Sequence, residues 1–371
     1  MKKSTLSRRD ALSLGGAAAL LPQTAGRAAA GPATNWPIVE GPGTPKLCLG
    51  GARDETSLRR YRQLGIDYLI GGGPGPLPWS EAAIRAEIDK CKAAGVTLDN
   101  MMIGGFSNAI YARPERDKDI ENVILTIRNA GRAGLPVIEY NWYAHRAMEG
   151  YFEETGRAGL GHTGFDYERM RNLPPLPEIG AHSLDTMWAN ITYFLKAVIP
   201  EAEKAGVRLA LHPNDPPPLI SRGSGQIMST LAGWKRLIAI VDSPSNGITY
   251  DCGVTRELGE DPIEVLRYFG SRKRINHMHY RNVIVRKPYE RYTEVSIDEG
   301  QVDMFGVMKE VVRLKYTGAI YPEHPRALDY DREAAKAAGG LRGYPGGGGY
   351  AGTAFCVAYA RAMLQAALAS A

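Results

Sequence analysis

Four residues of metal-ligating types each close an apolar, strand-like run in the second half of the chain. They are His212, Cys252, His279 and Glu323. Imidazole, thiolate and carboxylate ligands together suit manganese, iron, cobalt, nickel or zinc, and suit magnesium and calcium poorly. Each residue taken alone has an ordinary explanation, such as a small buried thiol or an ion pair. Four ligand types at successive strand ends would be a rare coincidence, so the sequence predicts a metal site.

The period-2 alternation of a strand indicates which neighbours share a face with the predicted ligands. The pairs that should share a face are Ala210 with His212, Tyr250 with Cys252, and His277 with His279. His277 should lie one layer deeper in the protein, where a core hydrogen bond is expected. On the same alternation, Asp251 should point outward towards the helices or lie in the following loop.

The elements that would position these residues alternate between short apolar strands and helices. The strand candidates are Lys46–Leu49, Ile66–Ile70, Val96–Met102, Pro136–Asn141, Arg208–His212, Gly247–Cys252, Ile275–Tyr280 and Ala319–Glu323. Four of them follow a glycine that should end a helix, at positions 65, 95, 134 and 206. This alternation predicts a single-domain (β/α)8 TIM barrel, whose strand ends meet at one mouth. A doubly wound open sheet is the alternative, but no GxGxxG sequence opens a helix.

Two connections are longer than the short loops that such a barrel needs. Residues 142–185, after the fourth strand, are rich in Gly, Arg, His and Tyr, and we expect an extended segment over the barrel mouth. Residues 336–353, after the eighth strand, contain two clusters of glycine and include Tyr350. This second connection is either a flexible spacer or a mobile loop that brings Tyr350 over the site.

The first thirty residues form a separate segment. The sequence SRRD at residues 7–10 precedes an apolar run and then three alanines at residues 28–30. This pattern is typical of a twin-arginine export signal that is cleaved near Gly31. We therefore predict a signal peptide at 1–30, a catalytic domain at 31–371 and a periplasmic location. A disordered basic arm is the alternative, because the twin-arginine pattern is imperfect.

The net charge indicates the class of binding partner, and the cysteine spacing indicates whether disulfides are expected. The net charge of +5 falls to +1 without residues 1–30, which hold five basic residues and one acidic residue. A nearly neutral chain lacks the excess of positive charge that binding to nucleic acid or to an anionic membrane surface requires. A small-molecule partner is therefore expected. A homo-oligomer is compatible with the sequence. The four cysteines show no CxxC spacing, which is typical of isolated thiols rather than of a disulfide framework.

From about residue 188 to its end, the chain carries an ordered series of short segments. They are Asn190–Glu203, Val207–Pro217 (VRLALHPNDPP), Ser243–Gly253, His279–Asn282, Gly300–Met304 and Pro322–His324. This series resembles the mannonate dehydratase family, within the xylose isomerase-like barrel superfamily. The resemblance implies a barrel enzyme that removes water from a six-carbon sugar acid, D-mannonate or a related aldonate. The implied product is a 2-keto-3-deoxy acid, and the implied cofactor is Mn²⁺ or Fe²⁺.

The same resemblance implies roles for individual residues. His212, Cys252, His279 and Glu323 fall on the family's metal ligands, His324 on its catalytic histidine and Tyr350 on its catalytic tyrosine. Which of the last two acts as acid and which as base stays open. The family's ligand aspartate is a glutamate here, one methylene longer, which puts the substrate in doubt more than the metal.

Four residues are candidates for binding the substrate. Asn214 stands where the family has an aspartate, so it could redirect the choice of substrate. Arg281 lies just after the seventh strand and could grip the substrate carboxylate, or form an ion pair at the barrel rim. Arg157 and His162, in the long fourth connection, could reach the distal hydroxyls.

Two other functions stay open from the sequence. A metal-dependent sugar isomerase or epimerase of the same superfamily would use a comparable ligand set, but needs no acid for a departing hydroxyl. A non-catalytic periplasmic sugar-acid binding protein is the third candidate. Such a protein is expected to have two lobes joined by a hinge, in contrast with a single closed barrel.

Overall fold

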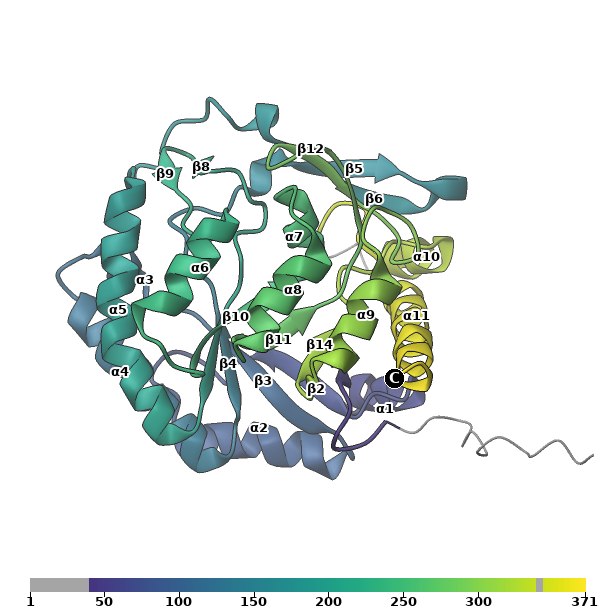
Figure 1. The fold of residues 1–371 in the computed structure, drawn as a ribbon, viewed down its shortest axis with the longest axis horizontal. Coiled ribbons are helices and arrows are strands. Elements are labelled where there is room, and N and C mark those ends of the chain that lie inside the picture. The colour runs from purple at the N-terminus through teal and green to yellow at the C-terminus, as the bar shows by residue number, and fades with distance from the viewer. Residues whose placement is uncertain (1–39, 338–342) are drawn as a thin grey trace, which may run out of the picture. The chain divides into compact units, whose positions relative to one another are not determined.

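Eight parallel strands close into a barrel within the residues that the computed structural model describes, 40–337 and 343–371 (Figure 1). They are β1 (Lys46–Gly50), β2 (Tyr68–Gly72), β3 (Thr97–Ile103), β4 (Val137–Tyr140), β7 (Arg208–Leu211), β10 (Asn246–Asp251), β11 (Ile275–His279) and β14 (Ala319–Tyr321). Their order around the barrel follows the chain, and β14 pairs with β1 to close it. They match the eight strand candidates, so the predicted TIM-barrel fold is confirmed. The predicted export signal at 1–30 lies outside the described residues.

Helices connect the strands and surround the barrel (Figure 1). They are α1 (Glu55–Gln63), α2 (Glu81–Ala93), α3 (Ser107–Tyr111), α4 (Arg116–Ala133), α5 (Leu184–Ala205), α6 (Leu231–Ile240), α7 (Cys252–Glu257), α8 (Pro262–Ser271), α9 (Met304–Arg313), α10 (Asp329–Ala337) and α11 (Tyr350–Ala369). Several begin with a side-chain cap: the hydroxyl of Ser183, for example, accepts the N–H of Thr186 at the start of α5. In the described part of the chain, every helix is too short or too polar to cross a membrane.

Glycine turns the chain from helix into strand where the sequence predicts it. Gly134, with a φ of 87°, follows α4, and Gly206, with a φ of 67°, follows α5. Gly65 and Gly95 also have positive φ values, of 72° and 75°. A side chain would strain the backbone in this left-handed region, so these glycines set the direction in which β2, β3, β4 and β7 begin.

Two insertions that follow barrel strands pair with each other in a second sheet. The segment after β4 carries β5 (Tyr151–Thr155) and β6 (Gly161–Asp166), and the segment after β11 carries β12 (Val283–Lys287) and β13 (Arg291–Glu294). They form an antiparallel sheet in the order β12-β13-β6-β5, which we call the cover sheet (Figure 1). The predicted extended segment after the fourth strand thus contains regular structure between Met148 and Arg169. The remaining short elements are the 3-10 helices η1 (Met148–Gly150), η2 (Arg157–Gly159) and η3 (Tyr167–Arg169) and the strands β8 (Ile220–Ser221) and β9 (Ser224–Gly225).

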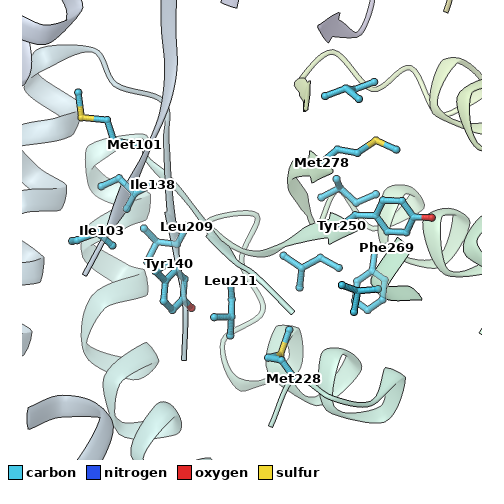
Figure 2. Close-up of a cluster of buried hydrophobic side chains, with 14 of the residues drawn as sticks. Met101, Ile103, Ile138, Tyr140, Leu209, Leu211, Met228, Tyr250, Phe269 and Met278 are labelled. Atoms are coloured by element: carbon cyan, nitrogen blue, oxygen red, sulfur yellow. The ribbon is translucent and has the colours of Figure 1, made fainter. Parts of the chain in front are cut away.

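Strand alternation divides the barrel residues between an outer and an inner face. Tyr250 of β10 and Met278 of β11 belong to the large apolar cluster between the barrel and its helices, part of which Figure 2 shows. Their neighbours along the strands therefore face the barrel interior. These inward residues are Asp251, His277 and His279, which lie side by side where β10 pairs with β11. The interior thus carries the polar groups, and the apolar residues hold the helices.

Candidate metal centre and active site

Ligand atoms from four neighbouring strands converge at the barrel mouth. His212 Nε2 lies 3.1 Å from His279 Nδ1, and the same nitrogen of His279 lies 3.1 Å from Glu323 Oε2. Asp251 Oδ2 lies 3.8 Å from that nitrogen. All four side chains are buried. Three of the four predicted ligands are therefore in one place, which we call the ligand cluster, and Asp251 is its fourth member.

The surroundings of His212 leave one of its nitrogens available for an ion. His212 Nδ1 donates to the carbonyl of Pro213 at 2.7 Å, so the unprotonated Nε2 faces His279. An orienting bond of this kind is usual for a histidine that binds a metal. Burial opposes a charged His279, but Glu323 and Glu139 outweigh it and raise the pKa of His279 to about 9. The cluster thus attracts positive charge, and its nitrogen and oxygen donors fit a divalent transition ion.

Cys252 is the first residue of α7, directly after β10, and its side chain packs away from the ligand cluster. Tyr250 is turned outward, where its hydroxyl donates to the carbonyl of Pro262 at 2.6 Å, and Cys252, two residues later, packs in the same apolar core. The Cys252 thiol donates to the carbonyl of Arg281 at 3.2 Å, and burial raises the pKa of this thiol. The expectation that Asp251 points outward is wrong. The structure places Asp251, and not the predicted Cys252, in the ligand cluster.

A further carboxylate faces His279 from β4. Glu139 Oε1 lies 3.6 Å from His279 Nε2 and accepts the hydroxyl of Thr249 at 2.7 Å. His277 lies deeper and is fully buried, but neither of its ring nitrogens has a hydrogen-bond partner among the described residues. Burial lowers the pKa of His277 to about 4. The expected core hydrogen bond of His277 is therefore missing from this part of the structure, and His277 is a neutral ring beside Glu139.

Arg281 provides the positive charge that holds these carboxylates together. Its nitrogens lie near the carboxylates of Glu257 (2.7 Å), Asp251 (3.1 Å), Glu323 (3.1 Å), Asp215 (3.5 Å) and Glu294 (3.9 Å). The side chain is only 2% exposed, so solvent hardly screens these ion pairs. The geometry favours the ion-pair interpretation of Arg281 over a free grip on the substrate. Arg281 orients two members of the ligand cluster, Asp251 and Glu323.

His324 stands beside the cluster with one ring nitrogen held. Its Nδ1 lies 2.7 Å from Glu294 Oε2, at the end of β13, and its Nε2 lies 3.5 Å from Glu323 Oε2. Burial disfavours the charged ring, but Glu294 and Glu323 raise the pKa of His324. In return, His324 and Arg281 overcome the burial of Glu294 and lower its pKa to about 2. The neighbouring carboxylates therefore favour the charged form of His324, whose Nε2 is on the side of Glu323.

The tyrosine that packs against His324 is Tyr344. The centroids of the two rings lie 4.8 Å apart, and the guanidinium of Arg146 lies 5.3 Å from the centroid of the Tyr344 ring. Tyr350 instead begins α11, where its hydroxyl contacts the carbonyl of Arg60 at 3.5 Å. The predicted role of Tyr350 is therefore not supported by its position. Tyr344, six residues before Tyr350, is the tyrosine beside His324, whereas the start of α11 lies against Arg60.

The other predicted substrate-binding residues are occupied by contacts within the protein. Asn214 is 1% exposed, and its side-chain oxygen accepts the N–H of Met228 at 2.7 Å. Its side-chain oxygen therefore fixes the loop that carries Met228. Arg157 and His162 both lie next to Glu299, at 3.2 Å and 3.5 Å. Arg157 and His162 therefore share Glu299 as a neighbour, and Glu299 is not a member of the ligand cluster.

Several acidic residues of the site were not predicted as site residues from the sequence. They are Glu139, Asp251, Glu257 and Glu294. Glu139 and Asp251 are charged residues inside apolar strands, and a buried charge requires a partner. That rule could have identified both of them. Glu257 and Glu294 carry no such signal, because their partners come from distant segments of the chain.

Comparison with known proteins identifies the family. Residues 161–367 match the family model described as D-mannonate dehydratase (UxuA). The mannonate dehydratase of Thermotoga petrophila is 30% identical over 319 residues, which cover 75% of this chain and 88% of the relative. That of Enterococcus faecalis is 30% identical over 327 residues, which cover 77% and 89%.

Solved structures agree with this relationship. The mannonate dehydratase from Streptococcus suis serotype 2 superimposes with a TM-score of 0.77 at 26% identity, over 88% of this chain and 94% of that one. A D-psicose 3-epimerase from Clostridium cellulolyticum H10 has a TM-score of 0.56, but at 13% identity it shows the shared barrel alone. The chain therefore belongs to the mannonate dehydratase family and is a hydro-lyase that acts on a sugar acid.

Proposed function

We propose that this hydro-lyase is metal-dependent and converts D-mannonate, or a closely related aldonate, into a 2-keto-3-deoxy sugar acid. Its relatives are named mannonate dehydratases, which supports this class of substrate. One observation carries the proposal: His212, His279 and Glu323 converge directly beside His324. A group of ligands next to a protonated imidazole is the combination that dehydration of a sugar acid requires.

Mn²⁺ or Fe²⁺ is the proposed cofactor, and His212, His279, Glu323 and Asp251 would hold it. When bound, such an ion supplies a Lewis acid that stabilises negative charge developing on the substrate carboxylate as the neighbouring C2 proton leaves. The protein keeps the ligands in position: Arg281 orients the two carboxylates. The orienting bonds are as important as the ligands, because they fix the directions of the lone pairs.

Dehydration also needs two proton transfers, one from C2 and one to the hydroxyl that leaves from C3. In this proposal His324 donates the second proton. Glu294 holds its Nδ1 and favours the charged ring, while Nε2 lies on the side of Glu323. Tyr344 packs on the same imidazole and is the second group placed to handle a proton. The cover sheet supplies Glu294 and so contributes directly to the acid.

The test is an assay of the full chain after chelation and return of Mn²⁺ or Fe²⁺. D-mannonate should yield a 2-keto acid with the metal and none after chelation, as measured by a colorimetric assay for 2-keto acids and by mass spectrometry. A product of unchanged mass would favour the isomerase or epimerase alternative. Tight binding without turnover would favour the non-catalytic binding protein. Either outcome would overturn the proposal.

We also propose that the protein acts outside the cytoplasm, and this rests on residues 7–10 and 28–30 of the sequence alone. Replacing Arg8 and Arg9 together by lysine should retain the protein in the cytoplasm, because the twin-arginine pair is read by its export receptor. Cell fractionation followed by immunoblotting measures this. Unchanged export of the double variant would contradict the proposed location.

A further inference from the structure

A cavity of about 680 Å³ lies next to the ligand cluster, along strands β1 to β4. Two of the residues that line it, Glu139 and Tyr321, also contact the cluster. Glu139 Oε1 lies 3.6 Å from His279 Nε2, and the ring of Tyr321 stands edge-on to that of His279 with 5.5 Å between centroids. The cavity and the proposed metal centre are therefore neighbouring compartments of one barrel mouth.

Glycine main chain and apolar side chains form most of the cavity wall. The glycines are Gly50, Gly51, Gly71, Gly72, Gly104 and Gly105. Ile70, Met102 and Ile110 are apolar residues of the lining. An aldonate chain carries a hydroxyl on nearly every carbon, and each buried hydroxyl needs a hydrogen-bond partner. A wall of this kind is poorly matched to the linear acid itself.

The cavity is also large for a six-carbon chain. Volumes of roughly 300–1,000 Å³ accommodate drug-sized ligands, and the reacting carbons must lie next to His324 and Glu323. The space along β1 to β4 is therefore available for a second part of the substrate, attached to the end that does not react.

Residues with polar side chains are spaced along the same wall: Asn100, Ser107, Glu139, Asn141, Tyr143 and Tyr321. Asn141 Nδ2 contacts the sulfur of Met102 at 3.8 Å, a weak bond that a ligand hydroxyl would replace with a stronger one. Ser107 and the aromatic residues Tyr143 and Tyr321 also line the cavity. Apolar and aromatic surface with a few hydroxyl and amide groups suits a pyranose ring, which has C–H faces and a polar edge.

We propose that the substrate is a sugar acid that carries a second sugar ring, and that the glycine-lined cavity receives this ring. The inference rests on the proposed dehydratase function. The ring must be joined through an oxygen beyond C3, since the C2 proton and the C3 hydroxyl leave together as water. The C2–H and C3–O bonds break, a C2–C3 double bond forms, and the resulting enol becomes the 2-keto group. The glycosidic bond is unchanged.

Gly72 is the position at which the cavity can be filled with least disturbance. Ile70 and Gly72 alternate on β2 and so share the cavity face. A Cβ at Gly72 meets no atom within 4 Å, and its φ lies outside the left-handed region. Gly104, after β3, offers the same space and provides a second variant. Gly43, ahead of β1, has equally open surroundings away from the cavity lining and is the matched control.

The experiment compares kcat/KM of the Mn²⁺-loaded full chain for two acids, D-mannonate and 4-O-β-D-glucopyranosyl-D-mannonate. Wild type should prefer the glycosylated acid by at least about tenfold, because remote contacts contribute to the transition state. Gly72→Leu and Gly104→Leu should lower this preference by about tenfold or more, as expected for a filled pocket. Gly43→Leu should keep it. Preference of wild type for the plain acid, or an unchanged ratio in both filled variants, would overturn the inference.

Failure of the proposed function would be recognised separately. If neither acid is dehydrated, isothermal titration calorimetry with lactobionate and D-gluconate decides the inference by binding alone. Lactobionate should then bind wild type more tightly than D-gluconate does, and Gly72→Leu should remove the difference. Equal binding of the two acids by wild type would contradict the inference. Circular dichroism of each variant establishes that the barrel is folded.

Discussion

The two halves of the barrel mouth share one architecture and carry opposite chemistry. On β7, β10, β11 and β14, the strand ends present the ligand cluster, a group of charged and imidazole side chains. At the ends of β1, β2 and β3, the corresponding places hold Gly50, Gly72 and Gly104, and the last two have open space beside them. The buried charges of the first group must be balanced against one another, and Arg281 does so. Glycine carries no side-chain charge that has to be compensated. The ends of β1, β2 and β3 can therefore change shape without disturbing the ligand cluster.

Glu139 marks the boundary between these halves. It lines the cavity on one side and faces His279 Nε2 on the other. Asn100 also lines the cavity, and its amide donates to Glu139 Oε2 at 3.3 Å. A single carboxylate thus connects the groups that react with the groups that are proposed to select the substrate. This division of labour can be tested from each side.

Removal of His279 should have the largest effect, because its two nitrogens face Glu323 and Glu139 respectively. We expect His279→Ala to lose bound metal and to reduce kcat/KM by at least about 1,000-fold, or ~4 kcal/mol. Metal content by mass spectrometry and the 2-keto acid assay measure both. His182→Ala is the control, since His182 stacks on Tyr111 away from the ligand cluster. Full activity of His279→Ala would remove the distinction between the two halves.

Tyr344 and Tyr350 provide the next largest contrast. Tyr344→Phe should lower kcat by roughly 100-fold, the size of effect usual for a group that transfers a proton. KM should change little, because the aromatic ring stays against His324. Tyr350→Phe should stay within about twofold of wild type, since its hydroxyl contacts only the main chain of Arg60 in the described structure. The reverse order of effects would return the catalytic role to Tyr350.

Asp251 and Cys252 contrast the last, inward-facing residue of β10 with the first residue of α7. Asp251→Asn should weaken metal binding by about 10–100-fold, because it removes a charge from the ligand cluster. Cys252→Ser should weaken it less, since the thiol donates to the carbonyl of Arg281. Titration of the chelated protein with Mn²⁺ measures both affinities. A larger loss in Cys252→Ser would restore sulfur to the ligand set.

Asn214 should show the smallest effect, confined to stability. Asn214→Ala leaves the buried N–H of Met228 without its acceptor, which should cost about 1–3 kcal/mol of unfolding free energy. Urea denaturation measures this loss. The ratio of activities on D-mannonate and D-gluconate should be the same as in wild type. A changed ratio would return Asn214 to substrate selection.

The barrel could be predicted from sequence because its strands are buried on both faces. Such strands read as short apolar runs, and glycines at 95, 134 and 206 end the helices that precede three of them. The ligand cluster could be predicted in part for the same reason. A polar residue that closes an apolar run, such as His212 or Glu323, lies at the mouth whatever the details of packing.

The remaining features depend on contacts that no local pattern records. The hydroxyl of Tyr250 is bound to the carbonyl of Pro262, and this contact decides that Asp251 and not Cys252 faces inward. The choice between Tyr344 and Tyr350 depends on the backbone of residues 345–349, and glycine places little restriction on the backbone that could be recognised from sequence. Arg281 looked like a substrate contact because its carboxylate partners come from elsewhere in the sequence.

The cover sheet has a consequence for how this protein can be recombined with its relatives. β6 and β13 pair directly, with Thr163 opposite Glu294, although three barrel strands and several helices separate them in the sequence. A crossover between these two segments would join half of one sheet to half of another and would misplace the carboxylate that holds His324. We therefore expect active chimaeras to inherit both insertions from one parent, as a single unit of inheritance spread over distant parts of the gene.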